Sequence, residues 1–381
     1  METVINCRRI VTPTDVMSGH IVVKDGLIAE LGSGPSQVNG ALDWTDEILT
    51  PGLIDIHTDN LEKHYMPRPG ARWDRFGAAL AHDGQMATAG VTTVLDSLSL
   101  HGRSGHGFDR SEALSDLIGA LDDAEAADAL RVDHKLHLRC EVTNPQLFEL
   151  LEGYLDTDRL QMLSVMDHTP GARFPGGLEA IKEKWRGQGK SEEDIQARID
   201  RQGDWRDSTR ASERRGQVAS LGAEYNLPVA SHDDGMAEHI DEAKELGCTI
   251  AEFPITSEAA ARATEVGLVN VMGAPNFVRG RSHGDNLSAR ELATTGKLDA
   301  LCSDYVPQSM IRAAFMLTED PFNWSLNEAL ETVTAAPAKM SNLSDRGEIS
   351  IGMRADILRV AKAESGWPLI REVWRVGERV A

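Results

Sequence analysis

His57 and Asp59 stand two residues apart at the end of a short apolar run, residues 53–56, which follows Pro51-Gly52. Side chains two apart in an extended chain project to the same side, so an imidazole and a carboxylate could grip one divalent cation here. Taken alone, such a triplet is more often ordinary polar chemistry at the end of a strand. The rest of the chain must therefore supply further ligands.

Further ligand-type residues come at the ends of other apolar runs. Glu141 closes the run 135–141, His168 follows 162–167, His232 follows 227–231 and Asp304 follows 299–303. With the first pair they make six oxygen or nitrogen donors, enough to hold two divalent ions bridged by a carboxylate and a hydroxide. Such a centre generates a nucleophile at neutral pH and polarises a phosphoryl or carbonyl oxygen. Each residue alone has an ordinary packing explanation, but the whole set at successive strand ends is much harder to explain in that way.

The elements that must position these donors alternate between strands and helices from about residue 51 to 344, which is typical of βαβ units around a parallel sheet. The expected strands are 53–57, 91–97, 135–141, 162–167, 227–231, 248–253, 268–273 and 299–303, and the expected helices are 75–89, 110–129, 145–155, 212–225, 237–246, 257–266 and 289–294. Eight strands favour a closed α/β fold, a (β/α)₈ TIM-type barrel, whose C-terminal rim would carry the site. An open doubly wound sheet is the alternative, but the chain has no G-x-G-x-x-G after a first strand and no Walker motif.

Both ends of the chain predict β-structure outside this barrel. Residues 21–23 and 27–31 flank an Asp25-Gly26 turn, a hairpin pattern, and the segments 347–360 and 372–380 also resemble strands. We expect residues 1–50 and 345–381 to pair as one small β-sandwich domain, because each piece alone is too small to be stable; two unrelated edge hairpins are the alternative. A polar insertion at about 171–215, with helix-compatible residues 191–201, could form a lid or a contact in a homo-oligomer, or could be a solvated excursion without catalytic function.

Composition restricts the class of protein. The 381 residues carry a formal net charge of -21, which argues against broad binding to nucleic acid or to an anionic membrane. The N-terminus lacks the order of a signal peptide, and no apolar run approaches the roughly 18 residues that span a bilayer, so we expect a cytoplasmic protein. The four cysteines are widely spaced without a C-x-x-C, which predicts buried reduced thiols.

Five motifs together resemble one known family. They are residues 51–64 (PGLIDIHTDNLEKH), 67–70 (PRPG), 166–171 (MDHTPG), 273–283 (GAPNFVRGRSH) and 303–307 (SDYVP). The chain resembles the amidohydrolase superfamily over essentially its whole length, and these motifs resemble its PhnM-type enzymes of the carbon–phosphorus lyase pathway. The resemblance implies a metal-dependent diphosphatase that hydrolyses ribose 1-methylphosphonate 5-triphosphate to the 5-phosphate and pyrophosphate in phosphonate degradation.

The resemblance also implies roles for the six donors. His57 and Asp59 would bind the more buried metal, Glu141 would bridge both ions, and His168 and His232 would hold the second. Asp304 would touch metal and act as the general base on the bridging water. Most of the superfamily has histidine where Asp59 stands, and an oxygen ligand there leaves the metal open between zinc, our first choice, and manganese or iron.

A triphosphate substrate implies concentrated cations in this acidic protein. The candidates are Lys63, His64, Arg68 and Arg72 after the first strand, and Arg279 and His283 after the seventh. Two alternatives remain open at this point. One is a cyclic amide hydrolase of the dihydroorotase or hydantoinase kind, which needs few cations, and the other is a non-catalytic scaffold that kept the fold but would be expected to have lost metal ligands.

Overall fold

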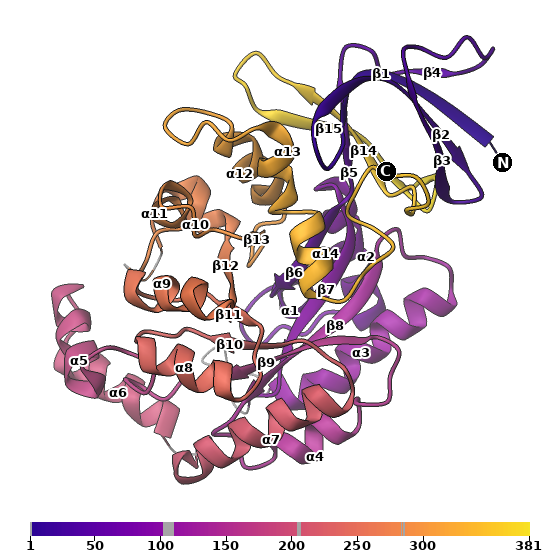
Figure 1. The fold of residues 1–381 in the computed structure, drawn as a ribbon. Coiled ribbons are helices and arrows are strands. Elements are labelled where there is room, and N and C mark those ends of the chain that lie inside the picture. Colours follow the sequence, from indigo (N-terminus) through magenta and orange to yellow (C-terminus); the bar gives the residue numbers. More distant parts are fainter. Residues whose placement is uncertain (1, 102–109, 204–206, 283, 285) are drawn as a thin grey trace.

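The computed structural model describes the chain apart from residues 1, 102–109, 204–206, 283 and 285 (Figure 1). Eight parallel strands follow one another in chain order around a barrel. They are β6 (Leu53–Thr58), β7 (Val91–Ser99), β8 (Asp133–Glu141), β9 (Leu160–Met166), β10 (Val229–His232), β11 (Ile250–Glu252), β12 (Val269–Gly273) and β13 (Ala300–Cys302). The amide of Asp304 donates to the carbonyl of His57, and the amide of Asp59 donates to the carbonyl of Asp304, both at 2.9 Å. The segment after the last strand is thereby tied to the first strand.

Continuous burial explains the barrel strands. Every residue of β6 and β7 is buried, as expected for parallel strands covered on both faces. A cluster of apolar side chains from seven of the strands, including Ile54, Leu95 and Met162, packs together with Ala338 and Met340 of α14. Since strands all around the ring contribute, this cluster fills the interior of the barrel.

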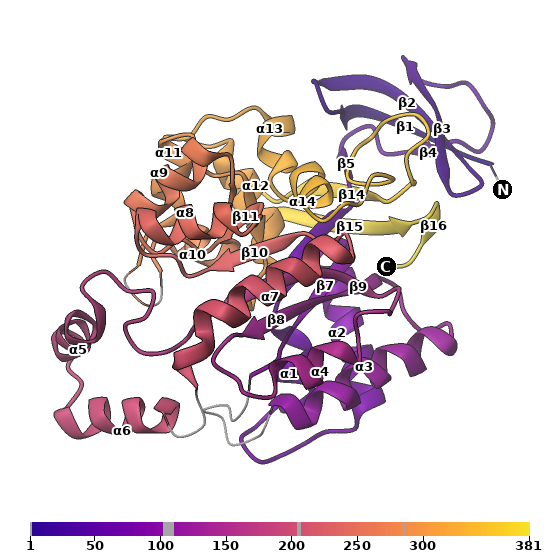
Figure 2. The same cartoon turned by 60° about the horizontal axis from the view of Figure 1, so that its bottom comes forward.

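Helices alternate with the strands and cover the outside of the barrel (Figures 1 and 2). They are α1 (Asn60–Tyr65), α2 (Arg75–Thr88), α3 (Arg110–Ala126), α4 (Leu147–Glu152), α5 (Gly177–Gly187), α6 (Glu192–Gly203), the 3₁₀ turn η1 (Ser208–Arg210), α7 (Ala211–Glu224), α8 (Ala237–Glu245), α9 (Ser257–Val266), α10 (Ala274–Arg279), α11 (Ala289–Thr294), α12 (Ser309–Leu317), α13 (Leu326–Glu331) and α14 (Ala335–Met340). The helix α9 has the bounds that the sequence predicted. Among the described residues, no helix is both long and apolar enough to cross a bilayer.

The two chain termini share a second sheet, shown beside the barrel in Figure 1. Its strands are β1 (Glu2–Val11), β2 (Val16–Lys24), β3 (Leu27–Ser33), β4 (Leu42–Asp43), β5 (Ile48–Pro51), β14 (Ile357–Lys362), β15 (Pro368–Arg375) and β16 (Glu378–Arg379). The antiparallel pairing of β14 with β5 joins the C-terminal strands to the N-terminal ones. The predicted fold class, a TIM-type barrel with a β-structure from both termini, is therefore confirmed.

Details of the terminal sheet differ from the sequence expectation. The strand expected over 347–360 begins only at Ile357, because residues 347–356 form turns whose backbone bonds to the β2–β3 hairpin, for example Gly352 to Ile28 at 2.8 Å. Leu358 and Val373 of this sheet belong to the same apolar cluster as Val91 and Val94 of the barrel. The division into a domain of 1–50 plus 345–381 and a domain of 51–344 stays a prediction.

Within the insertion at 171–215, the helices α5 and α6 project beside the barrel, away from the terminal sheet (Figures 1 and 2). Before residue 211 of this insertion the sequence predicts helix over 191–201, and the structure adds α5 in the polar stretch before it. Trp185 of α5 is buried, and the guanidinium of Arg198 on α6 lies 4.6 Å from the centre of its ring. This contact holds the two helices against each other.

Candidate active site

The six predicted ligands all lie at the C-terminal ends of barrel strands. His57 is the second-last residue of β6, and Asp59 follows that strand directly before α1. Glu141 and His232 are the final residues of β8 and β10. His168 and Asp304 each come two residues after a strand, β9 and β13. Because the carboxyl ends of parallel barrel strands share one rim, the fold brings these side chains to the same end of the barrel.

Their donor atoms form two groups that could each hold a cation. His57, Asp59 and Asp304 have donor atoms within 4.8 Å of one another, and so do His168, His232 and Asp233. Asp233 was not predicted. Asp304 has a left-handed backbone, with φ +55°, and the hydrogen bonds between its backbone and those of His57 and Asp59 fix it beside the first group. Non-glycine residues rarely adopt this conformation, and where they do it often marks a functional site.

Glu141 lies with the second group. Its carboxylate accepts from Thr143 Oγ1 at 2.6 Å and lies 2.9 Å from His168 Nδ1. Donor atoms of Glu141, His168 and His101 also lie within 4.8 Å of one another. The expected bridging of both ions by Glu141 stays a prediction, as do the metal and catalytic roles of the other five.

The sequence analysis missed Glu252, the last residue of β11. This fully buried carboxylate lies 2.6 Å from the Nδ1 atoms of both His57 and His232, one histidine at each oxygen. Burial by itself raises the pKa of Glu252, but the histidines outweigh it and hold the pKa well below the usual value. Glu252 is therefore an anion that accepts from both rings, and their Nε2 atoms remain for other partners.

Arg139 on β8 was also missed. Its side chain is buried, and Nη1 donates to Asp59 Oδ1 at 2.9 Å. Burial alone lowers the pKa of Arg139, but Asp59 and Glu252 outweigh it and raise the pKa above its usual value. A permanent cation thus lies inside the rim, where it offsets part of the charge of the carboxylates.

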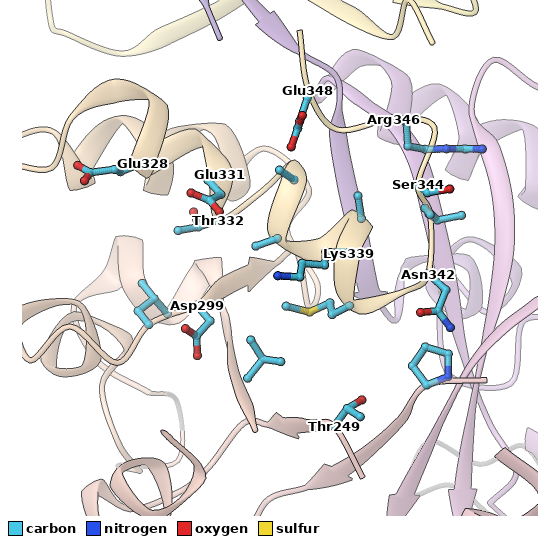
Figure 3. Close-up of a pocket in the computed structure, with 18 of the residues that line it drawn as sticks. Thr249, Asp299, Glu328, Glu331, Thr332, Lys339, Asn342, Ser344, Arg346 and Glu348 are labelled. Atoms are coloured by element: carbon cyan, nitrogen blue, oxygen red, sulfur yellow. The ribbon is translucent and has the colours of Figure 1, made fainter. Parts of the chain in front are cut away.

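These residues surround a cavity of about 270 Å³. Its lining includes His57, Asp59, His168, His232 and Asp304, together with Arg139, Arg279, Asn276 and Tyr305. A larger cavity of about 1410 Å³, shown in Figure 3, opens at the other end of the barrel, next to residues that precede strands, such as Thr249 and Asp299. Among the described residues, none that line this larger cavity belongs to a group of metal-type donors. Five of the six predicted ligands therefore line the smaller cavity, and none of the six lines the larger one.

The predicted phosphate-binding cations are placed unevenly. Arg279 lines the cavity, and Lys63 donates from Nζ to the carbonyl of Tyr305 at 3.1 Å beside it. The ring of His64 instead lies 2.9 Å from Gln85 on α2. Arg68 and Arg72 are exposed on the loop after α1 and do not line the cavity, and His283 lies outside the described residues. Local sequence does not fix the orientation of a loop side chain, so the sequence could name these cations as candidates without showing which of them face the cavity.

A second buried carboxylate lies between two histidines, as Glu252 does, but it is located beneath the rim. Asp96 of β7 contacts His82 Nε2 at 2.6 Å through one oxygen and His134 Nδ1 at 2.8 Å through the other. All three side chains are fully buried, and none lines the smaller cavity. This network links α2 to the barrel wall, and it offers a comparison for the bridge made by Glu252.

The donor set fits divalent cations. Imidazole and carboxylate ligands of this kind bind zinc, manganese and iron. Metal-binding histidines usually donate their other nitrogen to a carboxylate, and His57 and His232 both do so toward Glu252.

Known proteins share this chain's sequence and fold. It is 38% identical to the alpha-D-ribose 1-methylphosphonate 5-triphosphate diphosphatase of Escherichia coli (strain K12), over 99% of this chain and 100% of that protein. A model of the amidohydrolase family matches residues 193–364. The chain belongs to the amidohydrolase family. More distant relatives of this amidohydrolase include the imidazolonepropionase of Streptococcus pyogenes serotype M1, 25% identical over 96% of this chain and 90% of that protein.

Solved structures show the same fold. An N-acetylglucosamine-6-phosphate deacetylase from Pasteurella multocida aligns with a TM-score of 0.64 at 13% identity, over 100% of this amidohydrolase and 99% of that chain. An adenosine deaminase from Xanthomonas campestris with bound zinc gives a TM-score of 0.60 at 13% identity, over 99% and 92%. At these identities the likeness concerns the fold alone.

Proposed function

We propose that this amidohydrolase is a metal-dependent diphosphatase, which hydrolyses ribose 1-methylphosphonate 5-triphosphate to the 5-phosphate and pyrophosphate. The observation that carries the proposal is the 38% identity to the diphosphatase of that name over 99% of the chain. The site supports it, because the cavity joins two groups of metal-type donors with the cations of Arg139 and Arg279. Phosphoryl transfer needs this combination of cation binding and charge stabilisation.

His57, Asp59 and Asp304 would hold one divalent ion, and His168, His232 and Glu141 the other, with zinc as our first choice. The ions would supply Lewis-acid chemistry and lower the pKa of a water molecule. Asp304 accepts the proton of the attacking water through its carboxylate, as a general base. The water oxygen bonds to the phosphorus nearest the ribose, the bond from that phosphorus to the bridging oxygen breaks, and pyrophosphate leaves.

The cations of the cavity would bind the phosphate groups. Arg279 at the mouth presents a planar fork suited to phosphate oxygens, and Lys63 is a point charge beside it. Burial lowers the pKa of Lys63, while Asp59 and Asp304 act to raise it, so the ammonium group lies within the field of both carboxylates. The substrate is therefore expected to be held between the predicted metal ligands and the mouth of the cavity.

The test combines metal analysis with a pyrophosphate assay on Asp304→Asn. We expect bound divalent metal in the wild type, and a fall in pyrophosphate release of at least about 100-fold in the variant, since loss of a general base costs on the order of 10² to 10⁴. Asp299→Asn is the matched control, because Asp299 precedes the same strand and lines the opposite cavity. Cleavage of dihydroorotate or hydantoin without pyrophosphate release would replace the proposal with the cyclic amide hydrolase, and a chain without metal or activity would indicate a scaffold.

A further inference from the structure

We propose that Glu252 sets the tautomers of His57 and His232 together, so that one carboxylate prepares both predicted metal sites. The idea rests on the proposed function only in taking these histidines as metal ligands. Glu252 is a positioning residue here, because it acts through the two rings and does not line the cavity. Neither the sequence motifs nor the family resemblance pointed to it.

The hydrogen bonds give Glu252 one partner at each oxygen. Oε1 lies 2.6 Å from His57 Nδ1, and Oε2 lies 2.6 Å from His232 Nδ1. The three residues come from β6, β10 and β11, and all are buried. An ionised carboxylate only accepts, so the Nδ1 atom of each histidine donates to Glu252 and carries a proton.

In the neutral form of each ring the proton therefore stays on Nδ1, and Nε2 is the nitrogen that can bind a cation at a predicted site. His57 Nε2 lies 3.9 Å from Asp59 Oδ1, and His232 Nε2 lies 3.9 Å from Asp233 Oδ2. These carboxylates belong to different donor groups, since the first group contains Asp59 and Asp304 and the second contains His168 and Asp233. A single residue thus serves both groups.

Phe253 completes the support through an unusual backbone. Successive strand residues normally point to opposite faces, yet both Glu252 and Phe253 contact the same two histidines. The φ of Phe253 is +56°, a left-handed conformation that is rare for a bulky residue. Its ring meets His57 edge-on at 4.9 Å and His232 edge-on at 5.5 Å between ring centres. The strained turn holds the rings on a second side, which is consistent with a functional reason for the strain.

Replacing Glu252 with Gln changes the hydrogen bonds that set the histidine tautomers and leaves the packing of the side chain nearly unchanged. Gln has nearly the shape of Glu, but it offers one acceptor oxygen and one NH₂ donor. Only one histidine can then keep its proton on Nδ1. The other must accept at Nδ1 and carry its proton on Nε2, where it no longer binds a metal.

The experiment compares the wild type, Glu252→Gln and Asp96→Asn. Bound metal is counted after loading with zinc and removal of excess, and the tautomers are read from ¹⁵N chemical shifts of histidine-labelled, metal-free protein, with assignments from His57→Asn and His232→Asn. Asp96→Asn is the matched control, because Asp96 also bridges two buried histidines but lies outside the cavity. Melting temperatures report the cost to the fold in both variants.

We expect Glu252→Gln to lose about one metal ion per chain and to keep the Nδ1–H form at only one of the two histidines. Asp96→Asn should keep the wild-type metal count and both tautomers, even if it melts earlier. The proposal is overturned if both histidines of Glu252→Gln keep the proton on Nδ1. If that variant also keeps its metal, Glu252 has no role in either site, and if it loses all metal, Glu252 is itself a ligand. Equal metal loss in Asp96→Asn would also overturn the proposal, because it would show that loss of any buried carboxylate–histidine contact disturbs the barrel enough to release metal.

These measurements use no substrate. A wild type that shows the expected tautomers but releases no pyrophosphate would leave the role of Glu252 intact and sink the diphosphatase. If the wild type releases pyrophosphate while Glu252→Gln keeps both its metal and its tautomers, the role of Glu252 is refuted and the proposed diphosphatase activity stands.

Discussion

At the scale of single residues, the cavity mixes anions that suit metals with cations that suit phosphate. Asp59 shows the balance, because it faces His57 on one side and accepts from the buried Arg139 on the other. Burial raises the pKa of Asp59, but Arg139 and His57 outweigh it and lower the pKa. The carboxylate is therefore charged and available to a cation over the whole neutral range.

The two arginines Arg279 and Arg68 give a direct test of where the phosphates bind. Arg279 lines the cavity and reaches Tyr305 Oη at 3.4 Å, whereas Arg68 is exposed on a loop outside it. We expect Arg279→Ala to raise the KM for the triphosphate by roughly 10- to 100-fold, since hydrogen bonds to charged groups contribute about 1.5–3 kcal/mol. Arg68→Ala removes the same group and should change KM by less than about twofold. Steady-state pyrophosphate release checks both, and the reverse order would move the phosphate site to the loop.

At the scale of elements, the strand ends were readable from the sequence because each ligand follows an apolar run. His57, Glu141 and His232 are polar side chains at the last or second-last residue of buried strands. Glu252 was not readable, because β11 has only three residues and its partner His57 is 195 positions away. In local sequence, a buried glutamate after a short apolar run cannot be told apart from a solvent-exposed glutamate at the end of a strand.

The same limit applies to α5 and to the loop after α1. The lysines and glycines of α5 resemble a solvated segment, and the burial of Trp185 that fixes the helix depends on α6. Whether Arg68 or Arg279 faces the cavity depends on how the surrounding segments pack, and the hydrophobic periodicity of the local sequence does not indicate this. Sequence therefore predicts which helices and strands exist more readily than it predicts the direction of side chains in the loops between them.

The junction between the barrel and the terminal sheet can be tested at Gly90. This residue follows α2 with φ +87°, and an added Cβ would lie 2.6 Å from Ile370 and 3.0 Å from Leu358. Gly247 follows α8 with φ +89° and has nothing within 4 Å. We expect Gly247→Ala to cost about 1–2 kcal/mol from the left-handed backbone alone, and Gly90→Ala to cost about 1–3 kcal/mol more from overpacking.

Urea denaturation of the two variants supplies those free energies of unfolding. Because the two glycines share the same position after a helix, their difference isolates the contact with β14 and β15. Equal losses would mean that the terminal strands yield at this point and that the junction contributes little to stability.

At the scale of the whole molecule, the site and the main sources of stability lie apart. The terminal sheet contacts the barrel at Gly90, just before β7, whereas the ligands lie at the opposite ends of the strands. Apolar clusters fill the barrel interior and its helical shell, and backbone ladders join the strands. None of these contacts passes through the predicted ions, and His57 and His232 are held by Glu252 and Phe253, which are both part of the protein.

Removal of metal should therefore abolish activity while the fold persists. A ligand that binds only the native state stabilises it by about 2.7 kcal/mol at 100 times its Kd, and 1 kcal/mol shifts the Tm of a large domain by about 2–4 °C. We expect a chelator to lower Tm by roughly 5 to 10 °C per site and to leave the far-ultraviolet circular dichroism unchanged at 25 °C. The fall has a clear cause, since chelation removes a positive charge from beside Asp59 and Asp304, two carboxylates whose donor atoms lie close together. Adding zinc back should restore both Tm and pyrophosphate release. Loss of the circular dichroism signal on chelation would contradict the separation of site from core, because it would mean that the ions, rather than the packed barrel, hold the strand ends together.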